Sequence, residues 1–285
     1  MKVLVVGASG QLGAAICQEF KPHSEVVALE HRDLDITDDN RVRERVAAEA
    51  PNVIVNCVAY NLVDAAEDHP VDALNVNAFG VNALARAAAD VDAVLVHYST
   101  DFVFDGRGDR PYTETDTTNP ESVYAVSKLI GEWFAVDTPR HYIFRVESLF
   151  GRGAGGPLRG SAEAIIARIK AGEEVPVFVD RTVSPTYVVD AARATRAAIE
   201  HQLPSGLYHA VNSGLCSWWE FAEQAARELN REARLVPVML HEVTLRAKRP
   251  KYCALSNAKL ASLGISIPDW RDALGRSLDA QNTGA

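Results

Sequence analysis

The feature that most constrains the fold is a glycine motif that follows the first apolar run of the chain. VLVVG (3–7) leads into GASGQLG (7–13), where two residues separate Gly7 from Gly10 and another two separate Gly10 from Gly13. This spacing suits a strand that turns sharply into a helix: one glycine permits the turn, one lets backbone approach a pyrophosphate, and one allows close helix–strand packing. The free N–H groups and positive dipole end of such a helix favour phosphate. We therefore expect a dinucleotide site here, with a plain glycine turn as the alternative.

The first 150 residues alternate short aliphatic runs with longer helical patterns. We predict strands at 3–7, 25–29, 53–59, 93–99 and 142–146, and helices at 11–20, 39–50, 71–90 and 122–137. The strands are continuous Val/Ile/Leu runs, which is typical of parallel strands that are covered on both faces. The pattern therefore predicts an α/β fold with a doubly wound parallel sheet of Rossmann type.

The last part of the chain has a different sequence pattern. It begins with the glycine- and arginine-rich loop GRGAGGPLRG (151–160), and we expect further elements at 161–171, 175–179, 187–201, 207–211, 217–230 and 234–238 and a final helix from about Trp270. These elements indicate a small carboxy-terminal lobe that is interleaved with the sheet. We assign residues 1–150 and 175–212 to a dinucleotide-binding domain, and residues 151–174 and 213–285 to a substrate-binding lobe.

Composition excludes several classes of partner. The formal net charge of −9 argues against nucleic acid, which favours a basic surface. The amino terminus reaches glycine after a short apolar run, and no later stretch is as long as a spanning helix, so we expect neither a signal peptide nor a membrane anchor. The four cysteines are far apart and the eight histidines share no ligand spacing. We therefore predict a cytoplasmic protein with reduced thiols and no metal.

The stretch YAVSK (124–128) places a phenol and an ammonium one helical turn apart. Side chains at i and i+4 lie on one helix face, with Cβ atoms roughly 5–6 Å apart. Since a nearby ammonium favours the phenolate, we expect Lys128 to lower the pKa of Tyr124 from its usual value of about 10. Tyr124 could then act as a general acid towards a carbonyl, while Lys128 bonds the nicotinamide ribose. The alternative is a surface pair on an amphipathic helix.

Two hydroxyls complete this candidate site. Ser99 and Thr100 stand at the carboxyl end of the fourth long strand, in HYSTDFVFDG (97–106). Open α/β sheets bind their ligands at the carboxyl ends of the strands. A hydroxyl at that point would orient the carbonyl oxygen, so the combined pattern predicts a carbonyl reductase.

The end of the second strand gives conflicting signals about the cofactor. Glu30 would bond the adenosine ribose hydroxyls and favour NAD, whereas Arg32 would hold the 2′-phosphate of NADP. Both NADPH and NADH therefore stay open. We expect Asp35 and Ile36, in DLDITD (33–38), to flank the adenine. In the alternative, this segment is a helix-capping loop with Thr37 or Asp38 as the N-cap.

Taken together, these motifs resemble the extended short-chain dehydrogenase/reductases, and within them the dTDP-4-dehydrorhamnose reductase family. The blocks that carry the resemblance occur in family order: GASGQLG, LDITD, AYNLVDAAEDHP, STDFVFDG, YAVSKLIGE, DRTVSPTYVVD and RPKYCALSNAKL. The resemblance implies a catalytic trio of Thr100, Tyr124 and Lys128. It also implies pyrophosphate contacts from Gly7, Gly10, Gln11, Leu12 and Gly13, adenine contacts from Asp35 and Ile36, and a nicotinamide side lined by Ala59 and Tyr60.

What the resemblance implies about activity is reduction of the 4-keto group of a nucleoside-diphosphate 4-keto-6-deoxy sugar, with Tyr124 as general acid. The expected substrate contacts are Thr100, Asp101, Phe102 and Ser148. Phe102 stands where the family has a second tyrosine, Ser148 where it has tryptophan, and Asn61 where it has threonine, so the sugar and the nucleotide stay open. Two other functions also stay open, a non-catalytic dinucleotide-binding regulatory subunit and a sugar-nucleotide epimerase. A homodimer is the assembly we consider.

Overall fold

The computed structural model of the chain describes residues 1–153 and 156–283. Its centre is a six-stranded sheet in the order β10-β5-β4-β3-β1-β2, and every neighbouring pair is parallel. The strands are β1 (Lys2–Val6), β2 (Glu25–Leu29), β3 (Val53–Asn56), β4 (Val94–Thr100), β5 (His141–Val146) and β10 (Gly206–His209). The α/β fold of Rossmann type that the sequence predicts is confirmed.

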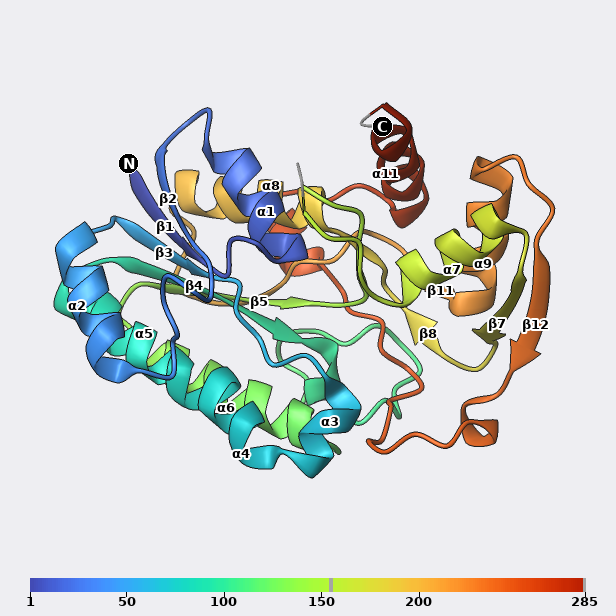
Figure 1. Cartoon of the computed structure of the whole chain (residues 1–285), viewed down its shortest axis with the longest axis horizontal. Coiled ribbons are helices and arrows are strands. Elements are labelled where there is room, and N and C mark those ends of the chain that lie inside the picture. The colour runs from blue at the N-terminus through green and yellow to red at the C-terminus, as the bar shows by residue number, and fades with distance from the viewer. Residues whose placement is uncertain (154–155, 284–285) are drawn as a thin grey trace.

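Helices cover both faces of this sheet (Figure 1). Helices α1 (Gln11–Phe20) and α8 (Val188–Glu200) lie on one face, and α2 (Asp39–Glu49), α5 (Gly80–Asp90) and α6 (Val123–Val136) lie on the other. Successive residues of β1 therefore enter different cores: Val3 and Val5 pack on the α1 side, whereas Leu4 and Val6 pack on the α2 side. This two-sided burial explains the unbroken apolar runs in the strands.

Two predicted elements, one strand and one helix, differ from the structure where the segment after β3 contacts the segment before α5. The predicted strand 53–59 ends at Asn56, and the predicted helix 71–90 is α4 (Pro70–Leu74), a π-helical segment η1 (Asn75–Phe79) and α5. Buried Asn77, in the π segment, accepts a hydrogen bond from Tyr60 N at 2.8 Å and donates one to Tyr60 O at 3.0 Å. These bonds satisfy the N–H and C=O groups of Tyr60, which lies after the end of β3. The structure also contains two short helices that we did not predict, α3 (Val63–Asp68) and α10 (Ala258–Ser262).

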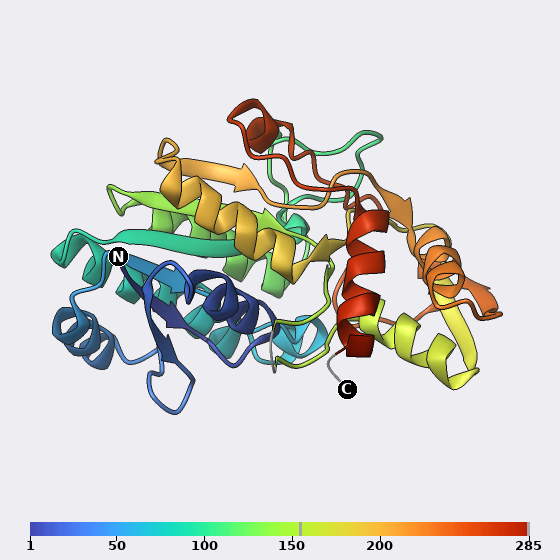
Figure 2. The same cartoon turned by 90° about the horizontal axis from the view of Figure 1, so that it is seen from above.

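The remaining elements form a lobe beside the sheet (Figures 1 and 2). It contains α7 (Ser161–Ala171), α9 (Trp218–Glu228) and α11 (Trp270–Thr283), and a two-stranded parallel sheet of β7 (Glu174–Phe178) and β12 (Arg234–Val238). Strand β7, which begins the range 175–212 that we assign to the dinucleotide-binding domain, pairs with β12, and the division into domains stays a prediction. The burial of β7 alternates along the strand, so one face packs on helices and the other meets solvent.

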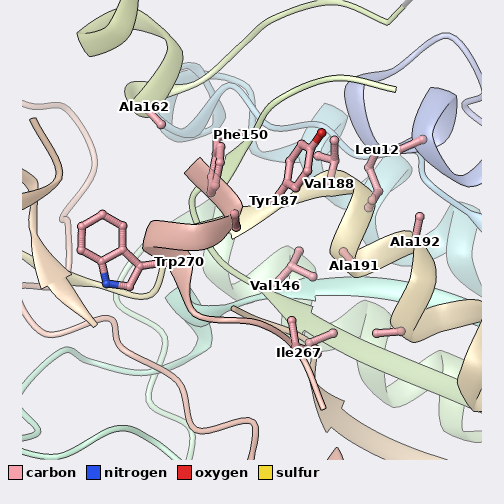
Figure 3. Packing of buried hydrophobic residues seen from close by; sticks show 14 of the residues in the cluster. Leu12, Val146, Phe150, Ala162, Tyr187, Val188, Ala191, Ala192, Ile267 and Trp270 are labelled. Atoms are coloured by element: carbon pink, nitrogen blue, oxygen red, sulfur yellow. The ribbon is translucent and has the colours of Figure 1, made fainter. Parts of the chain in front are cut away.

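Short strand pairs join the lobe to the central sheet. They are β6 (Leu149–Phe150) with β9 (Thr186–Tyr187), and β8 (Thr182–Val183) with β11 (Cys216–Ser217). One apolar core continues across this junction, from Leu12 in α1 to Trp270 in α11 (Figure 3). The rings of Phe150 and Tyr187 stack there with centroids 5.6 Å apart. The lobe is therefore packed firmly against the strand ends that carry the candidate site. Two 3₁₀ turns, η2 (Asp101–Val103) and η3 (Leu240–Glu242), complete the described elements.

None of the helices in the described part of the chain combines the length and the apolar character needed to cross a bilayer.

Candidate functional site

A cavity of about 510 Å³ opens at the carboxyl ends of β1, β3, β4 and β5. It lies at the point where strand order reverses between β1 and β3, which is where open α/β sheets bind ligands. Ten predicted site residues line this one cavity: Gly7, Gly10, Gln11, Leu12, Asp35, Ile36, Ala59, Tyr60, Tyr124 and Lys128. The structure thus brings the glycine motif and the YAVSK pair, which are more than 100 residues apart in sequence, to the same space.

The glycine turn has the geometry that its spacing predicts. Gly7 has a φ of +82°, in the region that favours glycine, and Gly10 is the N-cap of α1. A Cβ atom at Gly13 would lie 2.1 Å from the carbonyl oxygen of Gly7, so only glycine allows this approach of helix to turn. Gly13 itself lies behind the cavity wall and does not line it.

The Gln11 side chain faces the cavity and also bonds a distant loop. Its side-chain amide donates to Gly151 O at 2.7 Å and to Arg159 O at 3.3 Å. These bonds join the start of α1 to the 151–160 loop, and Arg159 itself lines the cavity. Sequence reasoning did not select Arg159 as a site residue, although the arginine content of the loop was a usable signal.

Asp35 lies where the cavity meets the start of α2, and its predicted contact with adenine stays a prediction. Asp35 lines the cavity, while its carboxylate accepts from Thr37 N at 3.0 Å and from Thr37 Oγ1 at 2.8 Å, which lowers its pKa. The N-cap of α2 is Asp38, which accepts from Arg41 N. The segment therefore lines the cavity and caps a helix at once.

The two residues that gave conflicting cofactor signals do not line the cavity. Glu30 and Arg32 pair with each other at 3.3 Å on the surface beside it. Their neighbours His31 and Leu34 do line it, and sequence reasoning named neither as a ligand contact. These positions do not select between NADH and NADPH.

Lys128 is held by its surroundings. Its side chain is buried, and its ammonium donates to Tyr98 O at 2.6 Å and lies 3.4 Å from His97 Nε2. Burial lowers the pKa of Lys128 to about 8, against the opposite effect of the Glu132 carboxylate. The ammonium is thus fixed at the cavity wall by β4, one turn along α6 from Tyr124.

The expected lowering of the pKa of Tyr124 is wrong for this structure. Burial and the charge of Asp101 raise the pKa of Tyr124 to about 12, and Thr100, which hydrogen-bonds the phenolate, only partly opposes them. The Lys128 ammonium donates to Tyr98 O. The Tyr124 phenol is consequently protonated at neutral pH, which is the form that a proton donor requires.

Four predicted substrate contacts lie next to the cavity but outside its lining: Thr100, Asp101, Phe102 and Ser148. Thr100 Oγ1 donates to Asp101 Oδ1 at 2.9 Å and accepts from Phe102 N at 3.2 Å. The Phe102 ring meets the Tyr124 ring edge-on with centroids 5.8 Å apart. Ser148 has a φ of 45°, a left-handed conformation that turns the chain sharply after β5.

A buried ion pair supports the floor of the site. Glu132 accepts two hydrogen bonds from the Arg145 guanidinium, each at 2.8 Å, and one from Ser99 Oγ at 2.5 Å. Ser99 lines the cavity, so this pair ties α6, β5 and the end of β4 together beneath it. Glu132 belongs to YAVSKLIGE, and its position four residues after Lys128 could have suggested this role.

A second buried cluster brings Asp101, Glu147 and Cys253 together, with their potential ligand atoms within 4.8 Å of one another. The Arg181 guanidinium already supplies positive charge there, because it donates to Cys253 Sγ at 3.5 Å. The absence of a metal stays a prediction.

Comparison with known proteins places the chain in a family. The model of the RmlD substrate binding domain family matches residues 1–283. The chain is 37% identical to a dTDP-4-dehydrorhamnose reductase of Streptomyces griseus, over 97% of this chain and 93% of that protein. It is 34% identical to the spore coat polysaccharide biosynthesis protein SpsK of Bacillus subtilis, over 99% of this chain and 98% of that protein.

Solved structures agree with the sequence comparison. The crystal structure of dTDP-4-dehydrorhamnose reductase from Bacillus anthracis in complex with NADP superposes with a TM-score of 0.92 at 33% identity, and covers 98% of this chain and 99% of its own. Both the family match and this superposition extend over nearly the whole length. The chain therefore belongs to the RmlD substrate binding domain family, which the resemblance in its motifs predicts.

Proposed function

We propose that this protein is an NAD(P)H-dependent reductase of the 4-keto group of a nucleoside-diphosphate 4-keto-6-deoxy sugar. The observation that carries the proposal is that Tyr124 and Lys128 line the same cavity as the glycine turn at the start of α1. A dinucleotide bound along that turn would bring its reactive end towards the phenol. The dTDP-4-dehydrorhamnose reductases to which the chain is similar support the choice of a 4-keto sugar nucleotide.

Each residue of the proposed trio has a role that its contacts favour. The neutral phenol of Tyr124 donates a proton to the sugar carbonyl oxygen, and the Thr100 hydroxyl, which bonds the phenolate, stabilises the form left behind. The fixed ammonium of Lys128 binds the ribose hydroxyls of the cofactor and holds them at the cavity wall. The nicotinamide cofactor supplies the hydride when bound. The protein itself holds the cofactor and the sugar carbonyl in position for the reaction.

Replacement of the phenol tests this assignment. We expect Tyr124→Phe to reduce kcat by at least about 100-fold, the usual scale of a lost general acid. Binding of NADPH or NADH should change little, because the glycine turn is untouched. The measurement is cofactor oxidation with dTDP-4-keto-6-deoxy sugars, together with a fluorescence titration of the cofactor. Full turnover in the variant would remove Tyr124 from the mechanism.

The same assay separates the alternative functions. A regulatory subunit would show no cofactor oxidation across a panel of sugar nucleotides and would co-purify with a stoichiometric enzyme partner. An epimerase would retain tightly bound NAD through purification, whereas a reductase exchanges its cofactor freely. Analysis of product stereochemistry with sugars that differ at one carbon would identify the substrate. Phe102 and Ser148 are the residues expected to contact that sugar near Tyr124.

We also infer that the protein is a homodimer. Five large apolar side chains are exposed on the adjacent elements α4, η1 and α6: Val71, Phe79, Val126, Trp133 and Val136. Their spacing along α6 places Val126 and Trp133 on one face, and Trp133 is 61% exposed. Apolar surface of this kind on neighbouring helices is typical of an interface. The second copy is the partner we expect to cover it.

Light scattering tests the assembly. We expect the native chain to have the mass of a dimer at micromolar concentration and Trp133→Asp to have the mass of a monomer. Leu215→Asp, at an exposed apolar position outside this face, is the matched control and should stay dimeric. A native chain that is monomeric at these concentrations would contradict the inference.

The proposed setting is the cytoplasm, with the nucleotide sugar as a small-molecule partner. All four cysteines are free thiols, which supports a reducing compartment. The net charge of −9 gives no support to a nucleic-acid partner.

A further inference from the structure

The carboxyl groups of Asp101 and Glu147 form a buried pair next to the proposed proton donor. Asp101 follows β4 and Glu147 follows β5, so the two residues lie at the ends of neighbouring strands. The side chains are 3% and 2% exposed, and their carboxyl oxygens lie within 4.8 Å of each other. One oxygen of each, Asp101 Oδ2 and Glu147 Oε1, is buried without a hydrogen-bond partner. Two carboxylates with free oxygens this close repel strongly unless they hold a proton.

The charges around the pair do not balance two carboxylates. From the segment after β7, Arg181 supplies one guanidinium, and from the carboxy-terminal segment Cys253 supplies a thiol that bonds Arg181. Tyr124 faces Asp101 from α6, and Ser184 N donates to Glu147 Oε2 at 2.5 Å. Burial raises the pKa of Asp101 to about 6, and burial together with the Asp101 charge raises that of Glu147 well above its ordinary range. At neutral pH, therefore, one proton remains on the pair.

A continuous set of polar groups leads from this pair to Tyr124. Thr100 Oγ1 donates to Asp101 Oδ1 at 2.9 Å, and its hydroxyl also lowers the pKa of Tyr124, whose ring packs edge-on against that of Phe102 in the same turn. A threonine hydroxyl can donate to one neighbour while it accepts from another, and its hydrogen rotates to suit. Thr100 is thus positioned to link the carboxyl pair to the phenol. The family resemblance selects Thr100 for the substrate carbonyl but leaves Asp101 and Glu147 without any part in proton transfer.

We propose that the Asp101–Glu147 pair stores one proton and returns it through Thr100 to Tyr124 after each reduction. The inference rests on the proposed reductase function. In the reduction, hydride from NAD(P)H joins the carbonyl carbon, the Tyr124 O–H bond breaks and its proton joins the sugar oxygen. Thr100 then donates its proton to the Tyr124 phenolate and takes one from Asp101, which receives the proton held with Glu147. Both carboxyl groups of the pair are then briefly ionised beside Arg181, and the pair takes up a new proton from solvent. Overall, one NAD(P)H and one proton are consumed for each alcohol formed.

Comparison of first and later turnovers of Glu147→Gln tests the relay. The first hydride transfer uses the proton already on Tyr124, so a stopped-flow trace of cofactor oxidation should keep its native rate within about twofold. Later turnovers need a new proton, so kcat should fall about tenfold or more and a burst should appear that the native enzyme lacks. Glu163→Gln, which changes another buried glutamate on α7, is the matched control and should show neither effect. An equal loss in the first and later turnovers, or no loss in either, would overturn the relay.

An infrared measurement checks the stored proton without any turnover. In the purified chain at neutral pH we expect the carbonyl band of a protonated carboxyl group, and this band should disappear in Glu147→Gln and in Asp101→Asn but persist in Glu163→Gln. Absence of the band from the native chain would overturn the inference even if the enzyme reduces its sugar. If the band is present but no sugar nucleotide is reduced, the proposed function fails and with it the relay, whereas the proton-holding pair stands.

Discussion

At the scale of single residues, the closest contact in the cofactor turn is the one at Gly13. We expect Gly13→Ala to force the turn open, because its Cβ would meet the Gly7 carbonyl at 2.1 Å. A clash with rigid backbone costs roughly 1–3 kcal/mol, and the displaced N–H groups should weaken cofactor binding by at least about tenfold. Thermal unfolding and cofactor titration are the measurements. Gly275→Ala, in α11, is the control, since its Cβ would lie at an ordinary contact distance of 3.6 Å from Glu228 Oε2. Equal effects in the two variants would contradict this account.

Tyr124 shows what sequence can and cannot predict at this scale. The four-residue spacing correctly places Tyr124 and Lys128 on the wall of one cavity. The direction of the pKa shift could not be predicted, since it depends on burial and on Asp101, which the fold brings in from the end of β4. Glu147 is a similar case, because the fold buries its charged side chain at 2% exposure. Spacing along one helix is local, whereas the electrostatic environment is tertiary.

At the scale of elements, α6 and the two strands beneath it depend on the Glu132–Arg145 ion pair. We expect Glu132→Gln to lower the free energy of unfolding by about 3–5 kcal/mol, because it leaves the buried guanidinium without a counter-charge. Denaturant unfolding measures the change. The control is Asp39→Asn, which removes the exposed partner of Arg43 on α2 and should cost no more than about 0.5 kcal/mol. Similar losses in both variants would mean that burial does not govern the pair.

The elements themselves were largely predictable where periodicity decides them. Strand β2 and helices α1 and α7 have the predicted bounds, because their apolar patterns are uninterrupted and their ends carry turn residues. The misses occur where a distant side chain decides the backbone. The π segment η1 and the early end of β3 both depend on Asn77 and its bonds to Tyr60. Strand β7 has nearly its predicted bounds, but it pairs with a strand about 60 residues later in the chain. Local patterns hold no information about such partners.

At the scale of the whole molecule, the site lies where two units that share one core meet. Strand ends of the central sheet supply the turn and the carboxyl pair, and α6 supplies the phenol, while Arg181 and Cys253 reach the same place from the segments that build the lobe. The change of sequence pattern after residue 150 indicates a second unit, and the division into domains stays a prediction. Because polar groups of both units are buried together, proton binding in this region affects the stability of the entire chain.

The pH dependence of global stability follows from buried His209. Burial and the Arg145 charge lower the pKa of His209 to about 3, whereas an unfolded histidine titrates near its ordinary value of 6.5. Between these values the unfolded chain binds a proton that the native chain does not, so the stability due to neutral His209 is complete above pH 6.5 and is lost as pH falls. Its slope is about 1.4 kcal/mol per pH unit. Asp101, with its raised pKa, acts in the opposite direction in the same range, so only a difference between variants isolates His209.

We therefore expect the gap in unfolding free energy between the native chain and His209→Asn to shrink by about 1.4 kcal/mol per pH unit from pH 6 to pH 4. Asparagine retains an amide that can replace the bond of His209 Nδ1 to Tyr112 O, which favours a folded variant. Denaturant unfolding at each pH gives the gap. The control variant is His23→Asn, which makes the same substitution at an exposed histidine. A constant gap for His209→Asn would show that this histidine binds its proton as readily in the folded chain as in the unfolded one.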